Sequence, residues 1–136
     1  MKRVTSRFTL IAILTFAILI ASGSASAQVD RTPKKRLTSP ATVNGYIGGE
    51  AHDSYVIRAQ KGRTMTVNIS WRRSGKNRAE FSVSRSANFY TSSPVNFGAE
   101  SNGGKRWRGK IRKTGNYYIY VVAHPTAKYT LRVRFE

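Results

Sequence analysis

The stretch KRWRGKIRKTGNYYIYV, residues 105–121, decides the fold that this sequence predicts. In its first half every second residue is a cation, and the residues between the cations are apolar or small. The four cations are Arg106, Arg108, Lys110 and Arg112. Side chains alternate between the two faces of a β-strand, so this period of two residues indicates a strand with one solvent-exposed face and one buried face.

The second half of the stretch predicts another strand, which pairs with the first. We expect residues 113–115 to form a three-residue hairpin loop that ends on a glycine with a positive φ. This register places Lys110 opposite Tyr118 and Arg108 opposite Tyr120, so arginine, lysine and tyrosine side chains share one outer face. If the two strands lay in opposite sheets, this combined Arg/Tyr face would not form.

Similar short alternating segments, separated by Gly, Ser and Asn, fill the chain after residue 40. The predicted strands are residues 42–47, 54–59, 64–71, 79–85, 105–112, 116–123 and 128–135. Residues 86–104 are rich in Ser, Asn and Gly, and we expect one short strand near Phe89 and Tyr90 within a long loop. No window has a sustained helical period. The sequence therefore predicts an all-β fold, an antiparallel jelly-roll-like β-sandwich of seven to eight short strands.

The first 27 residues have the features of a signal peptide. A basic start precedes an uncharged apolar run at residues 8–21, and small residues follow as far as Ala27. The run is shorter than the roughly 20 residues that span a membrane, so we expect cleavage between Ala27 and Gln28, with an uncleaved anchor as the alternative. Residues 28–40 are predicted to be a basic flexible lead-in, and residues 41–136 to form one domain. The expected location is the periplasm or the cell exterior.

The chain is strongly basic and contains no cysteine. It has 24 Lys and Arg residues against six Asp and Glu residues, a formal net charge of +18. Without the first 27 residues, 21 basic residues remain and the net charge is +15. The lack of cysteine excludes disulfides and zinc–thiolate sites. Such a charge favours anionic partners. For an exported chain these are acidic glycans, phosphate polymers, anionic lipids or acidic protein surfaces, rather than nucleic acid.

Few residues could support catalysis. The only histidines are His52 and His124, and His52 lies close to Glu50 and Asp53 ahead of a predicted strand. Three neighbouring side chains of one tight loop seldom converge on one metal ion, so we interpret Glu50 and Asp53 as residues that organise the turn. No motif prepares a nucleophile. We therefore expect no enzyme activity, no metal site and no cofactor.

Two basic clusters, residues 72–78 and residues 105–113, are the strongest signals of function. Arginine pairs bidentately with phosphate and carboxylate groups, and tyrosine rings can stack on sugars or guanidinium groups. The candidate residues for binding a ligand or partner are Arg106, Arg108, Lys110, Arg112, Tyr118, Tyr120, Arg72, Arg73 and Lys76. The alternative interpretation is a solvated basic face that discourages edge pairing and aggregation.

Several segments resemble the pre-peptidase C-terminal (PPC) domain of exported bacterial proteins. They are GYI at residues 45–47, DSYVI at 53–57, AQKGRTMTV at 59–67, TGNYYIYV at 114–121 and YTLRV at 129–133. The resemblance covers nearly all of residues 41–135 and implies a jelly-roll-like β-sandwich, with Gly62, Gly115 and Tyr117 at fold-motif positions. Free-standing proteins of this fold include periplasmic inhibitors of g-type lysozyme, which block a muramidase cleft with their loops.

Two functions follow from the resemblance and the charge. The first is an exported, non-catalytic inhibitor whose partner is a protein such as a lysozyme, with docking loops at residues 86–104, 113–115 and 123–128. The alternative is an envelope or surface module that binds anionic glycans or phosphates through the Arg/Tyr face.

Overall fold

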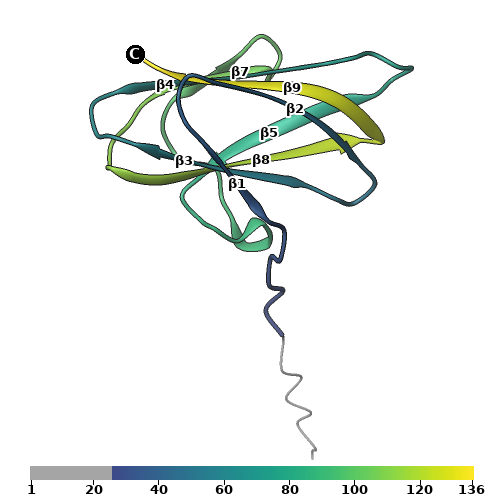
Figure 1. Cartoon of the computed structure of the whole chain (residues 1–136), viewed down its shortest axis with the longest axis horizontal. Helices are drawn as coiled ribbons and strands as arrows, with labels where there is room; N and C mark the ends of the chain where they lie inside the picture. The colour runs from purple at the N-terminus through teal and green to yellow at the C-terminus, as the bar shows by residue number, and fades with distance from the viewer. Residues whose placement is uncertain (1–25) are drawn as a thin grey trace, which may run out of the picture.

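The structure is a sandwich of two β-sheets, which lie one above the other in Figure 1. The computed structural model describes residues 26–136. The predicted signal peptide therefore lies outside the described residues, except for its last two positions. Ala27 and Gln28, on either side of the expected cleavage point, are both exposed. Among the residues described, no helix is long and apolar enough to cross a membrane.

Nine strands and one short 3-10 helix make up the described chain. They are β1 (Lys34–Leu37), β2 (Ala41–Gly48), β3 (Asp53–Ala59), β4 (Thr64–Trp71), β5 (Arg78–Ser84), η1 (Phe89–Thr91), β6 (Ala99–Ser101), β7 (Arg106–Lys110), β8 (Gly115–His124) and β9 (Thr126–Phe135). One sheet has the order β1-β3-β8-β5 and the other the order β2-β9-β4-β7-β6. The predicted all-β sandwich is confirmed, and each of the seven predicted strands overlaps an observed one.

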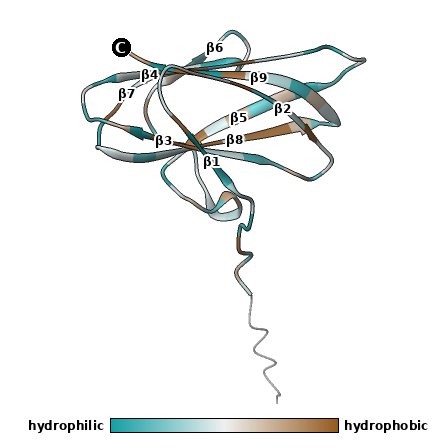
Figure 2. Ribbon diagram, viewed as in Figure 1, coloured by the Kyte–Doolittle hydropathy of each residue, from teal (hydrophilic) through white to brown (hydrophobic). Residues whose placement is uncertain are grey.

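The period of two residues directs apolar side chains into the space between the sheets. Met65, Val67 and Ile69 of β4 are buried there, in one cluster with Ile119 and Val121 of β8. Figure 2 shows the apolar colouring along β8. Because burial of apolar side chains is the main stabilising term in a chain without disulfides, the charged residues are left to the outer surfaces and the ends of the sandwich.

The predicted hairpin between residues 105–112 and 116–123 is wrong. β7 pairs with β4, where Arg108 lies opposite Thr66, whereas β8 pairs with β3 and β5 in the other sheet. The residues between Lys110 and Gly115 carry the chain from one sheet to the other. Alternation shows which face of a strand is buried but not which strand lies beside it, so both arrangements fit the same pattern.

Trp107 anchors β7 in the five-stranded sheet. Its indole packs against Gly109 of the same strand and Gly98 of the preceding loop, where an added Cβ would lie 2.5 and 2.6 Å from the ring. The Phe97 ring meets the indole edge to face, with the ring centres 5.9 Å apart. The two glycines therefore make room for a side chain that closes this edge of the core.

The segment between β5 and β7 also differs from its prediction. The strand expected near Phe89 and Tyr90 is η1, and the strand in this segment is β6 at Ala99–Ser101. The Asn88 side chain accepts a hydrogen bond of 3.0 Å from the Tyr90 N–H, and the Phe89 ring stacks on His52 with the ring centres 3.9 Å apart. An asparagine cap of this kind favours a helical turn over an extended strand.

The structure corrects the expectation of flexibility for part of the lead-in. Residues Lys34–Leu37 form β1, which runs parallel to β3. Ahead of β1, the Asp30 carboxylate accepts hydrogen bonds from the N–H groups of Thr32 (2.9 Å) and Phe89 (3.1 Å) and lies 3.2 Å from His52 Nε2. The side chains of Asp30 and His52 are both buried. In Figure 1 the lead-in and η1 both lie on the outer side of the four-stranded sheet.

Asp30 links the stability of the fold to pH. Burial alone would raise the pKa of Asp30, but the backbone N–H groups of Thr32 and Phe89, with the charges of Lys34 and His52, lower it from 3.8 to about 2. A lowered pKa stabilises the folded chain at pH values above the ordinary pKa. That contribution is lost as the pH falls through the folded-state pKa.

We therefore expect the free energy of unfolding of the native protein to fall by about 1–2 kcal/mol more than that of Asp30→Asn between pH 5 and pH 2. Urea unfolding of both proteins at a series of pH values measures this difference. The same pH dependence in both would contradict the role given to Asp30.

A hydrogen-bonded cluster joins the two sheets at one end of the core. The Tyr129 hydroxyl of β9 donates to Asp53 Oδ2 at 2.5 Å and lies 2.5 Å from the Tyr55 hydroxyl of β3. Lys35 of β1 lies 3.4 Å from the other oxygen of the Asp53 carboxylate. Gly45 makes room for the Tyr129 ring, because an added Cβ would lie 2.4 Å from it. Burial, followed by the hydrogen bonds, raises the pKa of Tyr129 far above its ordinary value.

Replacing Tyr129 with Phe should lower the free energy of unfolding by about 1–3 kcal/mol, because it leaves part of the Asp53 carboxylate without a donor. Chemical denaturation measures the change. Tyr46→Phe is the matched control, since the Tyr46 side chain on the neighbouring strand is 63% exposed, and it should leave stability unchanged. Equal stability of the two variants would show that the cluster does not stabilise the fold.

Candidate functional site

Two rows of cations lie on the outer surface of the five-stranded sheet. They alternate along their strands with core residues such as Trp107, Leu131 and Val133, so they point away from the core. We call these residues the basic sheet face; they are Arg106, Arg108 and Lys110 of β7, and Lys128, Arg132 and Arg134 of β9.

β4 lies between the two rows and presents uncharged polar side chains. Asn68 of β4 is paired with Arg106 on one side and with Arg132 on the other. Neighbouring strands are about 4.8 Å apart. Because one strand lies between the two rows, the rows are separated by about 10 Å. Within residues 26–136, neither of these arginines forms an ion pair, and neither does Lys128. Their charges are therefore available to a ligand.

Glu136 forms ion pairs with two arginines at the far part of the basic sheet face. One carboxylate oxygen accepts a hydrogen bond of 2.9 Å from Arg108, and the other lies 3.4 Å from Arg134. Thr66, which is paired with both arginines, is fully buried. The hydrogen bond from Arg108 and its charge lower the pKa of Glu136, and the charges of Arg134 and Arg106 lower it further.

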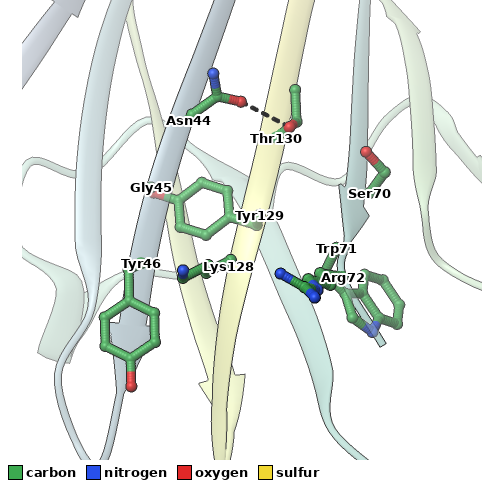
Figure 3. Close-up of a pocket in the computed structure, with 9 residues that line it drawn as sticks. All are labelled: Asn44, Gly45, Tyr46, Ser70, Trp71, Arg72, Lys128, Tyr129 and Thr130. Atoms are coloured by element: carbon green, nitrogen blue, oxygen red, sulfur yellow. Dashed lines mark hydrogen bonds between the residues drawn. The ribbon is translucent and has the colours of Figure 1, made fainter. Parts of the chain in front are cut away.

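A groove of about 510 Å³ opens on the same surface, over β2, β9 and β4. The residues that line it are Asn44, Gly45, Tyr46, Ser70, Trp71, Arg72, Lys128, Tyr129 and Thr130. Figure 3 shows Lys128 between Tyr46 and Arg72, and the register agrees, because Tyr46 is paired with Lys128. Thr130 Oγ1 donates a hydrogen bond of 2.7 Å to Asn44 Oδ1. The groove therefore combines an exposed aromatic ring, two cations, hydroxyl groups and an amide.

The predicted Arg/Tyr face does not form. Tyr118 and Tyr120 belong to the four-stranded sheet, and Tyr120 is buried, with its hydroxyl donating to the Ser86 carbonyl oxygen at 2.6 Å. This burial is the main cause that raises the pKa of Tyr120 to about 12. Arg112 lies beyond the end of β7, with its guanidinium 5.1 Å from the centre of the Phe97 ring. Only Arg106, Arg108 and Lys110 of the predicted face remain together.

The second predicted basic cluster lies at the groove. Arg72 lines the groove, and Arg73 lines an adjoining hollow that shares Tyr46 and Lys128 with it. Lys76 is exposed in the same loop. Because β4 leads directly into this loop and also pairs with β7, the structure brings the two clusters to the same sheet.

The predicted fold-motif residues serve turns and packing. Gly62 has a φ of +92° in the turn between β3 and β4. Gly115 has a φ of +148°, and an added Cβ would lie 2.9 Å from the Arg85 guanidinium. Arg85 donates to the Asn116 carbonyl oxygen at 3.0 Å and lies 4.6 Å from the centre of the Tyr117 ring. Gly115 therefore leaves space for a cation that covers Tyr117.

The described residues contain no group of three His, Cys, Asp or Glu side chains that could hold a metal ion. His52 and Asp53, which are neighbours in the sequence, make separate contacts, His52 with Asp30 and Asp53 with Tyr129. His124 Nε2 lies 3.6 Å from Glu80 at the surface.

Sequence reasoning missed the row of cations on β9 and the exposed Tyr46. A signal for both was present: residues 128–135, KYTLRVRF, alternate as regularly as residues 105–112, and the alternation of residues 42–47 places Tyr46 on the outer side. No local pattern, however, shows that β7 and β9 flank the same strand.

The fold is a β-sandwich whose five-stranded sheet presents an open, charged surface. PliG from Aeromonas hydrophila, a periplasmic lysozyme inhibitor of g-type lysozyme, has a TM-score of 0.61 and 21% identity over 76% of this chain and 96% of its own. The pre-peptidase C-terminal domain of collagenase from Bacillus anthracis has a TM-score of 0.56 and 17% identity over 79% of this chain and 100% of its own. PliG from Salmonella Typhimurium has a TM-score of 0.54 and 18% identity over 76% of this chain and 97% of its own.

At these identities the likeness shows the fold, and at that level the resemblance predicted from the sequence is confirmed. No protein-family model and no curated protein sequence matches the chain.

The bridge between Arg108, Glu136 and Arg134 can be tested by titration. Arg108→Gln removes the largest cause of the lowered pKa of Glu136, so this pKa should rise toward its ordinary value. NMR titration of the Glu136 side chain measures it. Arg132→Gln is the matched control, because Arg132 lies on the basic sheet face, in the β9 row, without contacting Glu136, and it should have a smaller effect. An equal rise of the Glu136 pKa in both variants would show that the overall positive charge, and not the contact with Arg108, lowers it.

Proposed function

We propose that this protein is exported with cleavage after Ala27 and acts as a non-catalytic binding protein on a lysozyme-type enzyme. The observation that carries the proposal is the fold shared with two PliG inhibitors over 96% and 97% of their own length. The shared fold therefore extends over nearly the whole length of both inhibitors.

The charge of the chain supports a glycosidase as the partner. Most glycosidases place two carboxyl groups in their substrate cleft, and a basic loop that enters the cleft pairs with them. Exposed cations occur in the loops at both ends of the sandwich. They are Arg72, Arg73 and Lys76 at one end, and Lys61, Arg112 and Lys113 at the other.

The loops that the sequence predicts as docking elements are divided between these ends. Residues 113–115 adjoin the turn between β3 and β4, where the Lys61 N–H donates to Thr114 Oγ1 at 2.9 Å. The turn at Pro125 adjoins Gly49, whose N–H donates to the Pro125 carbonyl oxygen at 3.1 Å. β8 separates the two turns by about 30 Å, so a cleft receives only one end of the sandwich at a time.

We expect inhibition of at least one of the g-, c- and i-type lysozymes in a cell-wall lysis assay. Arg73→Ser/Lys76→Ser and Arg112→Ser/Lys113→Ser each remove two exposed cations from one end, so they are matched controls for each other. The variant at the docking end should lose inhibition and the other should keep it. Absence of inhibition of every class at micromolar protein would overturn the proposal.

A further inference from the structure

We propose that the groove and the basic sheet face form a binding site for a linear acidic polysaccharide in which carboxylated sugars are separated by neutral ones. One acidic sugar lies in the groove, and the polymer continues along β4 between the two rows of cations. The site lies on the sheet surface; it shares Arg72 and Lys128 with one end of the sandwich but needs no enzyme partner.

The groove has the size and the chemistry of a sugar site. Its volume of about 510 Å³ lies within the range of small-ligand pockets, roughly 300–1,000 Å³. The Tyr46 ring, 63% exposed, offers an apolar face with a polar tip. Asn44, Ser70 and Thr130 supply hydroxyl and amide groups that both donate and accept hydrogen bonds, as sugar hydroxyls require.

The charges at the groove select an anion. Lys128 and Arg72 lie at the same level of the sheet, joined by a hydrogen bond of 3.0 Å from the Arg72 N–H to the Lys128 carbonyl oxygen. Both side chains are exposed and line the groove. An arginine beside a lysine suits a carboxylate, because the guanidinium binds it bidentately and the ammonium adds a point charge.

The spacing of the cations indicates how the polymer continues. The next level along β4, at Ser70 and Thr130, is uncharged, and the level after that places Arg132 and Arg106 on either side of Asn68. Lys128 and Arg132 are four residues apart, so the charged levels are separated by about 13 Å. A charged level, a neutral level and a second charged level match a polymer of acidic and neutral sugars. Beyond them, the next two arginines, Arg108 and Arg134, are both paired with Glu136.

The uncharged residues distinguish a polysaccharide from a phosphate polymer. A phosphate polymer gains its affinity from contacts with cations and from the release of counterions. The Tyr46 ring and the amide and hydroxyl groups of the groove would add nothing to its binding. The whole arrangement is accounted for by a ligand that has carboxylates, ring faces and hydroxyl groups together.

Calorimetry with hyaluronan oligosaccharides, in which glucuronate alternates with a neutral amino sugar, tests the proposal. Inorganic polyphosphate and neutral dextran are the comparison polymers. Lys128→Gln/Arg132→Gln removes two charges from the site, and Arg58→Gln/Lys61→Gln removes two exposed charges elsewhere. Tyr46→Ala alters the groove without a change of charge. All five side chains are exposed, and thermal unfolding confirms that each variant is folded.

We expect hyaluronan to bind with an affinity that falls as salt rises, and dextran not to bind. Lys128→Gln/Arg132→Gln should lose at least about tenfold in affinity, because charged hydrogen bonds contribute about 1.5–3 kcal/mol each, and Arg58→Gln/Lys61→Gln should remain near the native value. Tyr46→Ala should weaken hyaluronan binding and leave polyphosphate binding unchanged.

Three results would overturn the proposal: no hyaluronan binding, equal losses in the two charge variants, or a Tyr46→Ala variant that binds hyaluronan like the native protein. The assay contains no lysozyme, so its outcome is separate from the test of inhibition.

Discussion

The backbone ladders that join β4 to β7 on one side and to β9 on the other decide where the charge of this chain lies. Every second residue of these strands is apolar and packs between the sheets, so the cations of β7 and β9 can only point outward. Because both strands flank β4, the two rows face the same way, about 10 Å apart. Had β7 paired with β8, its cations would belong to the other sheet and to another set of neighbours.

The two outer surfaces of the sandwich are not equivalent. The four-stranded sheet is covered by the lead-in and η1, which Asp30 joins through its contacts with His52 and the Phe89 N–H. The five-stranded sheet is open, and Tyr129 connects its surface to the core. The Tyr129 hydroxyl is held by Asp53 inside the sandwich, while the residues on either side of it, Lys128 and Thr130, line the groove. The geometry of the groove is therefore fixed by the buried cluster beneath it.

The sequence was sufficient for the strands and for the class of fold. Alternation at residues 64–71 and 128–135 locates β4 and β9 closely, because each strand has one apolar face that must be buried. The sequence did not show which strands pair with each other. β7 and β8 are both amphipathic and close in sequence, so a hairpin satisfied every local rule. The packing of Trp107 against Gly98 of the preceding loop helps to hold β7 in the five-stranded sheet, and this contact between two segments is contained in no local pattern.

The candidate site was half predictable for the same reason. The three cations of β7 could be found from the sequence, since their alternation is a local property, whereas their partners on β9 depend on the sheet order. β1 was missed because its sequence, KKRL, contains a single apolar residue, Leu37, which is buried in the core.

Cross-strand nuclear Overhauser effects between backbone protons test the partition of the strands most directly. The sheet order predicts contacts that join β7 to β4, as between Arg108 and Thr66, and contacts that join β9 to β4, as between Arg132 and Asn68. Contacts between Lys110 and Tyr118, the pair that a hairpin of β7 and β8 requires, would contradict it.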